Sequence, residues 1–424
     1  MEARGPRQVC WAMLTIGALS VHGASPPPDT IAVDLHVSVP GDTPDNAIVY
    51  IAGNERAAGN WETDVVKLHR LDDGRWHIKL ELPKGGTLDY KFTLGSWSQV
   101  EKGGNGEEIA NRTAALDGDR QIGVAVKSWA KAGGQGPAGE NRKHTLTGSF
   151  KFHRAFKSKH LALTRDVIVW LPAGYEDAAN AQKRYPVLYM HDGQNLFDAA
   201  TSFAGVEWKA DETARELIGA GKIEPIIIVG ICNTSARMSE YTYGATPRPE
   251  GRSGEDYLLF IVEELKCFID STYRTQPDRK HTAVAGSSLG GLISLYMAST
   301  RPDVFSMSGV VSPSLFWDGG RAIKDVAGWA PHIKDVKFWI DMGTLEGRRN
   351  PDEQTSSAVT YCRNLIEAFQ KAGLVEGRNY KYLEVPGAQH NEYFWSLRLD
   401  RMLLYFFGTD AVGEAHSAAG RFAR

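Results

Sequence analysis

The sequence has few cysteines, no excess of either charge and no long hydrophobic run beyond its first 21 residues. Lysine and arginine total 48 and aspartate and glutamate total 51, which leaves a formal net charge of −3 over 424 residues. So even a balance gives no reason to expect a nucleic acid or an anionic membrane surface as a partner. The missing second hydrophobic run predicts that the mature chain has no membrane span.

The first residues have the features of a secretory signal peptide. Arg4 and Arg7 precede an apolar run, and the small residues Gly23 and Ala24 follow it. A basic start, a short apolar run and a small-residue cleavage point are typical of such signals. We therefore expect residues 1–24 to be removed and the protein to be secreted or periplasmic.

Four cysteines are present, and the first of them, Cys10, lies within the predicted signal. An odd number, Cys232, Cys267 and Cys362, would then remain in a compartment that permits disulfides. Cys232 belongs to an apolar strand pattern and the other two belong to helical patterns, so we expect buried free thiols. One disulfide among the three is the alternative.

The chain is too long for one hydrophobic core, and its pattern changes along the sequence. Residues 30–127 contain short alternating strands separated by Gly, Pro, Asn and Asp turns, which predicts a small all-β sandwich. Trp76, Tyr90 and Phe92 are expected in its core. Residues 128–144 are rich in glycine and charge and predict a linker.

Residues 145–408 alternate between apolar strand patterns and helical patterns. Repeated strand-then-helix units with nearly continuous apolar strands are typical of a mostly parallel sheet covered on both faces. The predicted fold class is therefore α/β, a doubly wound, mostly parallel sheet preceded by the sandwich. The small and polar residues 409–424 predict a flexible tail.

One glycine-rich junction stands out in this α/β unit, Gly286-Ser287-Ser288-Leu289-Gly290. The strand pattern HTAVA precedes it and a helical pattern follows it with almost no loop between them. Only glycines two residues before and after the serine let a strand and a helix pack that closely. This arrangement is the nucleophile elbow of an α/β-hydrolase, with Ser288 as the predicted nucleophile.

A serine hydroxyl needs a base within hydrogen-bond reach. His390 follows the strand pattern KYLEVP, at the carboxyl end where this fold places its base, and is the predicted base. A carboxylate should orient the imidazole, and the loop after the strand pattern VKFWIDM offers Glu346. Asp341, still within that strand pattern, is the alternative acid.

The oxyanion of an acyl-transfer reaction needs two N–H donors. The backbone amide of Leu289, at the start of the elbow helix, is the first predicted donor. The second is the amide of Gln194 in the loop HDGQN, whose glycine lets the backbone approach a reacting carbonyl. His191 and Asp192 open this loop and are predicted to line the substrate site. No third ligand has metal-binding spacing with them, so neither a metal nor another cofactor is expected.

Other residues are candidates for the walls of the substrate site. Trp208 opens a predicted helix, and Arg237 follows an apolar strand pattern on the active-site side. Arg237 could grip an acidic or aromatic acyl group, and an Arg237–Glu240 ion pair that braces the loop is the alternative. Trp317 and Trp395 are either pocket walls or core residues.

Six motifs occur in one order in this half of the chain, namely VWLPAGY, YPVLYMHDGQNLFD, AGSSLGG, SGVVSPSLFW, DMGTLEG and GAQHNEYFW. Through them the chain from about residue 145 to 407 resembles the putative esterase family, which contains feruloyl, acetylxylan and enterobactin esterases. The resemblance implies a serine esterase. It also implies that the amides of Gln194 and Leu289 are the oxyanion donors and that Glu346 is the acid.

Across about a hundred residues the predicted sandwich resembles the starch-binding type of carbohydrate-binding module, through IVYIAGNERAAGNW, DGRWHIKLELPKGGTLDYKF and GSWSQVEKGGNGEEIANR. The resemblance implies that Trp61 and Trp97 are sugar-binding surface aromatics. One position departs from it, because Val100 precedes Glu101 where such modules commonly place a sugar-stacking tryptophan. Glycan binding and a purely structural cap both stay open.

These features together predict a secreted or periplasmic serine carboxylic-ester hydrolase that acts through an acyl-enzyme. The expected substrates are carbohydrate-linked acetyl or feruloyl esters, with a polysaccharide as a partner of the N-terminal domain. A siderophore (enterobactin-like) ester hydrolase is one alternative. An acyltransferase, or a glycan-binding protein with an inactive hydrolase domain, are the others.

Overall fold

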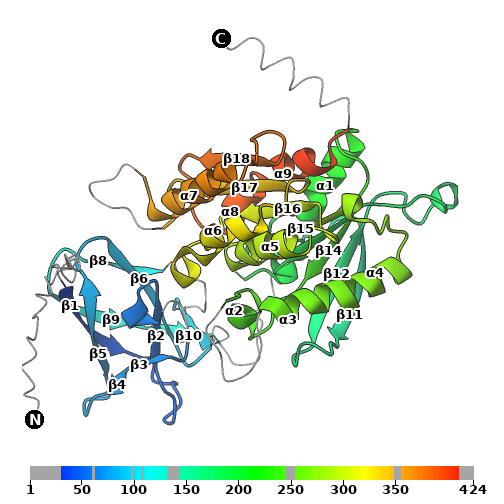
Figure 1. The fold of residues 1–424 in the computed structure, drawn as a ribbon. Coiled ribbons are helices and arrows are strands. Elements are labelled where there is room, and N and C mark those ends of the chain that lie inside the picture. Colours follow the sequence, from blue (N-terminus) through cyan, green and yellow to red (C-terminus); the bar gives the residue numbers. More distant parts are fainter. Residues whose placement is uncertain are drawn as a thin grey trace, which may run out of the picture.

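The computed structural model describes residues 30–59, 63–96, 99–104, 106, 109, 111–130, 143–203, 205–244, 254–347 and 355–409. In these residues the chain forms a β-sandwich followed by an α/β unit (Figure 1). The predicted signal peptide, Cys10, Trp61 and Trp97 lie outside them, as do residues 131–142 of the predicted linker.

The first unit is a β-sandwich that encloses its own apolar core. Its strands are β1 (Thr30–Ser38), β2 (Tyr50–Gly53), β3 (Val66–Lys67), β4 (His69–Arg70), β5 (Trp76–Pro83), β6 (Thr87–Thr93), β7 (Glu101–Lys102), β8 (Arg112–Ala115), β9 (Arg120–Ala125) and β10 (Ser128–Trp129). Two four-stranded sheets, ordered β4-β5-β1-β9 and β3-β2-β6-β8, form the sandwich, and β7 pairs with β10. Buried residues alternate along β1 and β5, as expected for strands with one apolar face. Trp76, Tyr90 and Phe92 lie in the core as predicted.

The second unit is built on one eight-stranded sheet, ordered β11-β12-β14-β13-β15-β16-β17-β18. Its strands are β11 (Ser149–Phe156), β12 (Arg165–Leu171), β13 (Val187–His191), β14 (Ile227–Ile231), β15 (Thr282–Ser287), β16 (Met307–Val311), β17 (Lys337–Gly343) and β18 (Tyr380–Val385). The strands from β14 to β18 are parallel, and β11 and β12 form an antiparallel edge. The predicted fold class is confirmed.

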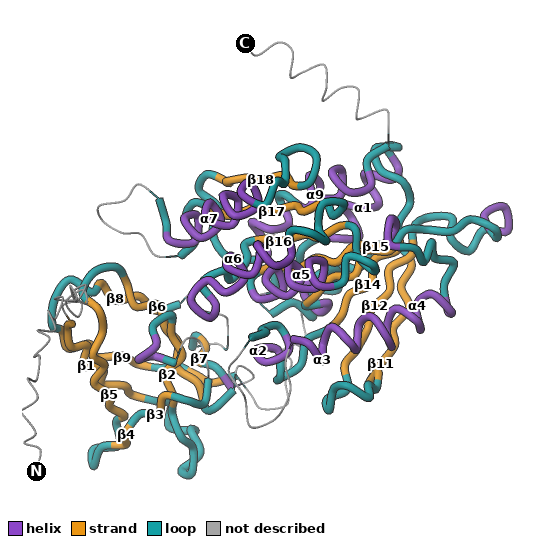
Figure 2. Tube along the Cα trace, in the orientation of Figure 1, coloured by secondary structure: helices purple, strands orange, loops and turns teal. Residues whose placement is uncertain are grey.

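Helices cover both faces of this sheet (Figure 2). They are α1 (Ala210–Gly219), α2 (Arg237–Glu240), α3 (Gly254–Leu259), α4 (Lys266–Thr272), α5 (Leu289–Thr300), α6 (Trp317–Trp329), α7 (Ser357–Lys371), α8 (Glu392–Ser396) and α9 (Leu399–Phe407). Residues of α3 to α7 share one apolar cluster with alternate strand residues, and residues of α1, α8 and α9 share a second cluster with the strand residues between them. Both faces of the strands are therefore buried, which explains their nearly continuous apolar sequences.

Two helices differ from the sequence prediction. The helix expected to open at Trp208 begins two residues later, because Lys209 has a left-handed backbone conformation with φ of 54°. The helical pattern of residues 392–407, read from the sequence as one final helix, is divided into α8 and α9. Arg398 lies at the break, directly before α9, and its buried side chain donates a hydrogen bond to Asp341 in β17.

The three described cysteines are free thiols, so the alternative of a disulfide among them is wrong. Cys232 and Cys362 are buried as expected, whereas Cys267 is exposed because it lies on the outer face of α4. None of the helices in the described part of the chain is long and apolar enough to cross a membrane.

Candidate active site

Ser288 occupies the sharp turn between β15 and α5. Its φ of 60° and ψ of −123° are strained for a residue with a side chain. A Cβ atom added to Gly286 would lie 2.9 Å from the carbonyl carbon of Gly290, so only glycine allows strand and helix to approach this closely. The Ser288 amide donates to the Val311 carbonyl at 3.0 Å, which anchors the turn to β16. The turn holds the half-buried hydroxyl at the carboxyl edge of the sheet.

His390 and Glu346 contact each other at the same edge. The imidazole Nδ1 of His390 lies 2.7 Å from Oε2 of Glu346, in the loops that follow β18 and β17. Burial alone would raise the pKa of Glu346, but His390 and Arg398 hold it below its usual range. The imidazole also packs edge-on against Trp395, with 5.0 Å between ring centroids. These contacts leave the second ring nitrogen of His390 as the one that could exchange a proton with a substrate or nucleophile.

Neighbouring parallel strands bring the three residues to one edge. Ser288 follows β15, Glu346 follows β17 and His390 follows β18, with β16 between the first two. In the described residues the Ser288 hydroxyl has the Ser314 hydroxyl as its hydrogen-bond partner, at 3.2 Å, and no hydrogen bond joins it to His390.

Asp341, the alternative acid, has other partners. It is fully buried in β17, where it accepts from Trp339 Nε1 at 2.7 Å and from Arg398 Nε at 2.8 Å. Arg398 also donates to the Ser312 hydroxyl at 2.5 Å, and Ser312 in turn donates to Glu346 at 2.8 Å. Arg398 therefore supports the whole acid side of the site. The sequence did not single it out, because nothing local distinguishes the buried Arg398 from the exposed Arg401 three residues later.

The two amides predicted as oxyanion donors belong to the first turns of helical segments. Leu289 is the first residue of α5, and Gln194 lies in the 3-10 turn Gly193–Asn195. The first N–H groups of a helix have no acceptor within the helix. A Cβ atom on Gly193 would lie 2.5 Å from the carbonyl carbon of Gly230, so glycine lets this loop lie directly against β14.

His191 and Asp192 are buried beneath the same loop. Nδ1 of His191 lies 3.0 Å from the Tyr257 hydroxyl, and burial lowers the pKa of His191 to about 3, so the ring is neutral at physiological pH. Asp192 accepts two hydrogen bonds from Arg237, both at 2.7 Å, and another from Asn233 at 2.6 Å. Burial opposes ionisation of Asp192, but Arg237 holds its pKa below the usual range. Both residues therefore brace the loop from below.

The alternative of an Arg237–Glu240 ion pair is wrong. Glu240 forms a buried ion pair with Arg165 at 2.7 Å, and Arg237 turns instead toward Asp192. The side chain of Arg237 stays 29% exposed. Its guanidinium therefore combines a structural role with access to the solvent beside the loop that contains Gln194.

The tryptophans near the site are mostly supports. Trp208 is 3% exposed and its ring lies 5.6 Å from that of Trp395, behind His390. Trp317 is half-buried, and its Nε1 donates to the Tyr243 carbonyl at 3.2 Å. One residue that the sequence did not point to is Glu392, which accepts from Asn195 Nδ2 at 3.1 Å and whose pKa burial raises.

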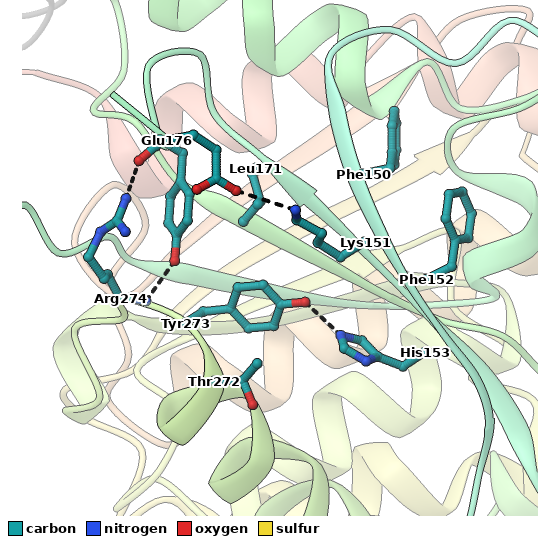
Figure 3. A pocket seen from close by; sticks show the side chains of 10 residues that line it. Phe150, Lys151, Phe152, His153, Leu171, Glu176, Thr272, Tyr273 and Arg274 are labelled. Atoms are coloured by element: carbon teal, nitrogen blue, oxygen red, sulfur yellow. Dashed lines mark hydrogen bonds and ion pairs between the residues drawn. The ribbon is translucent and has the colours of Figure 1, made fainter. Parts of the chain in front are cut away.

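A cavity of about 690 Å³ lies at the opposite end of the sheet from Ser288. Its lining includes Leu171 at the end of β12, which runs antiparallel to β14, so this end lies beside the start of the parallel strands. Figure 3 shows the Tyr273 hydroxyl in this cavity directed at the ring of His153, which lies 2.6 Å away. The cavity is therefore separate from the predicted active site.

In the sandwich, the position that departs from the starch-binding pattern is a core position. Val100 is fully buried, and the buried Glu101 carboxylate beside it forms an ion pair at 2.8 Å with the partly exposed Arg112. The next residue, Lys102, lies over the ring of Phe203 at 5.1 Å, so the sandwich contacts the loop that follows the turn Gly193–Asn195.

Comparison with known proteins supports both units. A family model described as "Putative esterase" matches residues 158–406, and one described as "Starch binding domain" matches residues 30–117. An alpha-amylase of Niallia circulans is 40% identical over 103 residues, which are 24% of this chain and 8% of that protein. An endo-1,4-beta-xylanase/feruloyl esterase of Xylanibacter ruminicola is 29% identical over 245 residues, which are 56% of this chain and 29% of that protein. The chain thus spans less than a third of either relative.

A solved structure of a ferulic acid esterase is similar with a TM-score of 0.49 and 20% identity, covering 61% of this chain and 98% of that one. The esterase model spans more than half of the 424 residues. Both resemblances inferred from the sequence are confirmed, and the chain belongs to the putative esterase family, with a starch-binding domain at its N-terminal end.

Proposed function

We propose that this protein is a serine esterase that cleaves carboxylic esters through an acyl-enzyme. The observation that carries the proposal is the shared edge of the sheet, where a strained serine follows β15 and a histidine bound to a buried glutamate follows β18. A nucleophile, a base and an orienting acid are the groups that acyl transfer requires.

In the proposed mechanism, Oγ of Ser288 attacks the ester carbonyl carbon while Nε2 of His390 takes the hydroxyl proton. Glu346 stabilises the imidazolium that results. The amides of Leu289 and Gln194 donate to the carbonyl oxygen as it becomes an oxyanion. His390 then returns the proton to the departing alcohol, and a water molecule repeats the sequence to release the acid. Hydrogen bonds of this kind commonly tighten only when substrate binds, so the Ser288 hydroxyl would then exchange Ser314 for His390.

We further propose carbohydrate-linked esters, of the feruloyl or acetyl type, as substrates. The match of residues 30–117 to a starch-binding domain supports a polysaccharide partner, and the partial similarity to a xylanase/feruloyl esterase supports the ester class. Export through the N-terminal signal would bring the enzyme to such a polymer.

The decisive experiment compares the wild type with Ser288→Ala on feruloyl-sugar, acetyl-sugar, tributyrin and catecholate-siderophore esters. We expect turnover that is fastest on a carbohydrate-linked ester and absent in the variant. Preference for the siderophore ester would replace the proposed substrate class, and equal turnover by the variant would remove Ser288 from the mechanism. Added polyol acceptor, with product analysis, distinguishes hydrolysis from acyl transfer to a sugar.

Glycan binding has its own test. Retardation of the full chain in native gels that contain starch or xylan is expected, and Trp61→Ala with Trp97→Ala should abolish it while ester turnover of p-nitrophenyl acetate continues. Unchanged mobility of the wild type in both gels would favour a structural role for the sandwich.

A further inference from the structure

Three carboxylates outside the proposed active site converge at the start of α1. Glu207, Asp211 and Glu212 each bring one carboxylate oxygen to within 4.8 Å of the others. Glu207 is 3% exposed and Asp211 is fully buried. None of the three forms an ion pair within the part of the chain that the structure describes. Negative charge is therefore concentrated here without a protein counter-charge in contact.

Each carboxylate also has one buried oxygen without a hydrogen-bond donor. These atoms are Oε2 of Glu207, Oδ1 of Asp211 and Oε2 of Glu212. Buried carboxylate oxygens normally face donors or a cation, because a bare buried charge is unfavourable. The unpartnered oxygens are therefore a second indication, besides the cluster itself, that this site binds a cation.

The ligand chemistry favours calcium. All the available donors are hard carboxylate oxygens, and neither histidine nor cysteine belongs to the cluster. Calcium binds such oxygens at about 2.3–2.6 Å in a flexible geometry, so ligands on opposite sides of the ion are roughly 4.6–5.2 Å apart. Separations of up to 4.8 Å are consistent with oxygens around one such ion. Magnesium demands shorter distances and stricter octahedral geometry, which makes it the informative comparison.

We propose that Glu207, Asp211 and Glu212 bind a calcium ion that fastens the start of the catalytic domain to α1. Thr147, two residues before β11, donates to Oδ2 of Asp211 through its amide at 2.5 Å and through its hydroxyl at 2.9 Å. One oxygen of Asp211 thus holds the chain that arrives from the sandwich, and the other faces the calcium site.

The same entry segment is held at a second point. Nδ1 of His144 lies 2.6 Å from one carboxylate oxygen of Asp198, and the amide of Thr145 donates to the other at 3.2 Å. The backbone amide of Trp208, adjacent to the calcium ligand Glu207, donates to the Asn195 carbonyl in the oxyanion turn at 2.9 Å. The ion would therefore stabilise the entry segment directly and the oxyanion turn indirectly, without taking part in the reaction.

The test uses the full chain treated with EDTA and then dialysed free of it. Isothermal titration with calcium chloride should show saturable binding to one site, and the unfolding temperature should rise with calcium concentration, as required for a ligand of the native state. Magnesium chloride should bind at least tenfold more weakly. Terbium should bind at the same site and emit on excitation of tryptophan, because Trp208 adjoins it.

Two variants and a matched control decide the outcome. Glu207→Gln, which leaves the Thr147 contact intact, and Asp211→Asn with Glu212→Gln should both lose calcium binding. Glu216→Gln removes one charge from the exposed side of the same helix and should bind as the wild type does. The proposal fails if the EDTA-treated wild type shows no saturable binding or if the two ligand variants bind unchanged. It also fails if the unfolding temperature responds to pH but not to calcium, since the carboxylates would then share a proton. None of these results bears on whether Ser288 is the nucleophile.

Discussion

Nε of Arg398 lies 2.8 Å from Oδ1 of Asp341, and both side chains are buried. Asp341 is the carboxylate that the sequence analysis gave as the alternative partner of His390, and it is bound to Arg398 instead. The imidazole contacts Glu346 instead, at 2.7 Å. The geometry therefore divides two neighbouring acids between two tasks, with Glu346 beside the predicted base and Asp341 supporting the strand end.

We predict opposite phenotypes for these two acids. Glu346→Gln should lower kcat about 10²–10⁴-fold with little change in KM, because the imidazolium loses its orienting charge. Asp341→Asn should instead lower the free energy of unfolding by about 3 kcal/mol, the low end for a broken buried pair, because Arg398 loses its 2.8 Å partner and keeps only the longer 3.4 Å ion pair with Glu346. Steady-state kinetics and urea denaturation of both variants measure the two effects. The reverse pattern would make Asp341 the catalytic acid.

Ser288→Ala should reduce kcat/KM for p-nitrophenyl acetate by about 10³-fold or more, since no other group can form the acyl-enzyme. The unfolding temperature should not fall, because alanine preserves the turn and only the hydroxyl is lost. Ser271→Ala is the matched control, an exposed serine on α4, and should retain wild-type rates. A fluorophosphonate, which loses fluoride to the serine oxygen and leaves it phosphonylated, should label the control and not Ser288→Ala.

The Asp192–Arg237 pair gives a prediction for stability. Arg237→Met should destabilise the protein by about 3 kcal/mol, the low end for buried pairs because the arginine side chain is 29% exposed. The double variant Arg237→Met with Asp192→Asn should recover part of that loss, because it removes the carboxylate charge that Arg237→Met leaves unpaired. Arg301→Met, which breaks a more exposed pair with Asp303, should cost less than about 1 kcal/mol. Equal losses for the two arginines in urea denaturation would contradict the burial argument.

The contribution of His191 to stability should rise from acid toward neutral pH. His191 ionises near pH 6.5 when unfolded, whereas in the folded protein burial lowers its pKa to about 3. Between these values the unfolded state binds more protons, so stability is present above pH 6.5 and is lost as the pH falls. Asp192 and Glu346, whose folded pKa values are depressed, add a further loss below about pH 4.5.

His191→Phe should therefore reduce the slope of unfolding free energy between pH 6 and pH 4.5 by about 1.4 kcal/mol per pH unit, the value for one proton. Urea denaturation at several pH values measures this slope. His332→Gln, at an exposed position, is the control and should leave it unchanged. An unaltered slope in His191→Phe would mean that another group titrates on unfolding.

Local signals explain why much of the fold was predictable. The elbow was visible because glycines at positions 286 and 290 leave room that no other residue would, and a Cβ atom on Gly286 would indeed lie 2.9 Å from the carbonyl carbon of Gly290. The buried strands were visible because both of their faces are apolar. Trp61 and Trp97 stay predictions, as do the signal peptide and the catalytic roles.

By itself, the sequence determined the order of elements, the parallel sheet and the loops that follow its strands, since these depend on periodicity and on backbone conformation. Only the tertiary structure decided which charges meet. Asp192 and Arg237 are 45 residues apart, Asp341 and Arg398 are 57 apart, and Thr147 and Asp211 are 64 apart. These pairs form only when elements that are distant in the sequence pack against each other. Which side chains then meet depends on the direction of each side chain at the ends of those elements, and no local sequence pattern shows that direction.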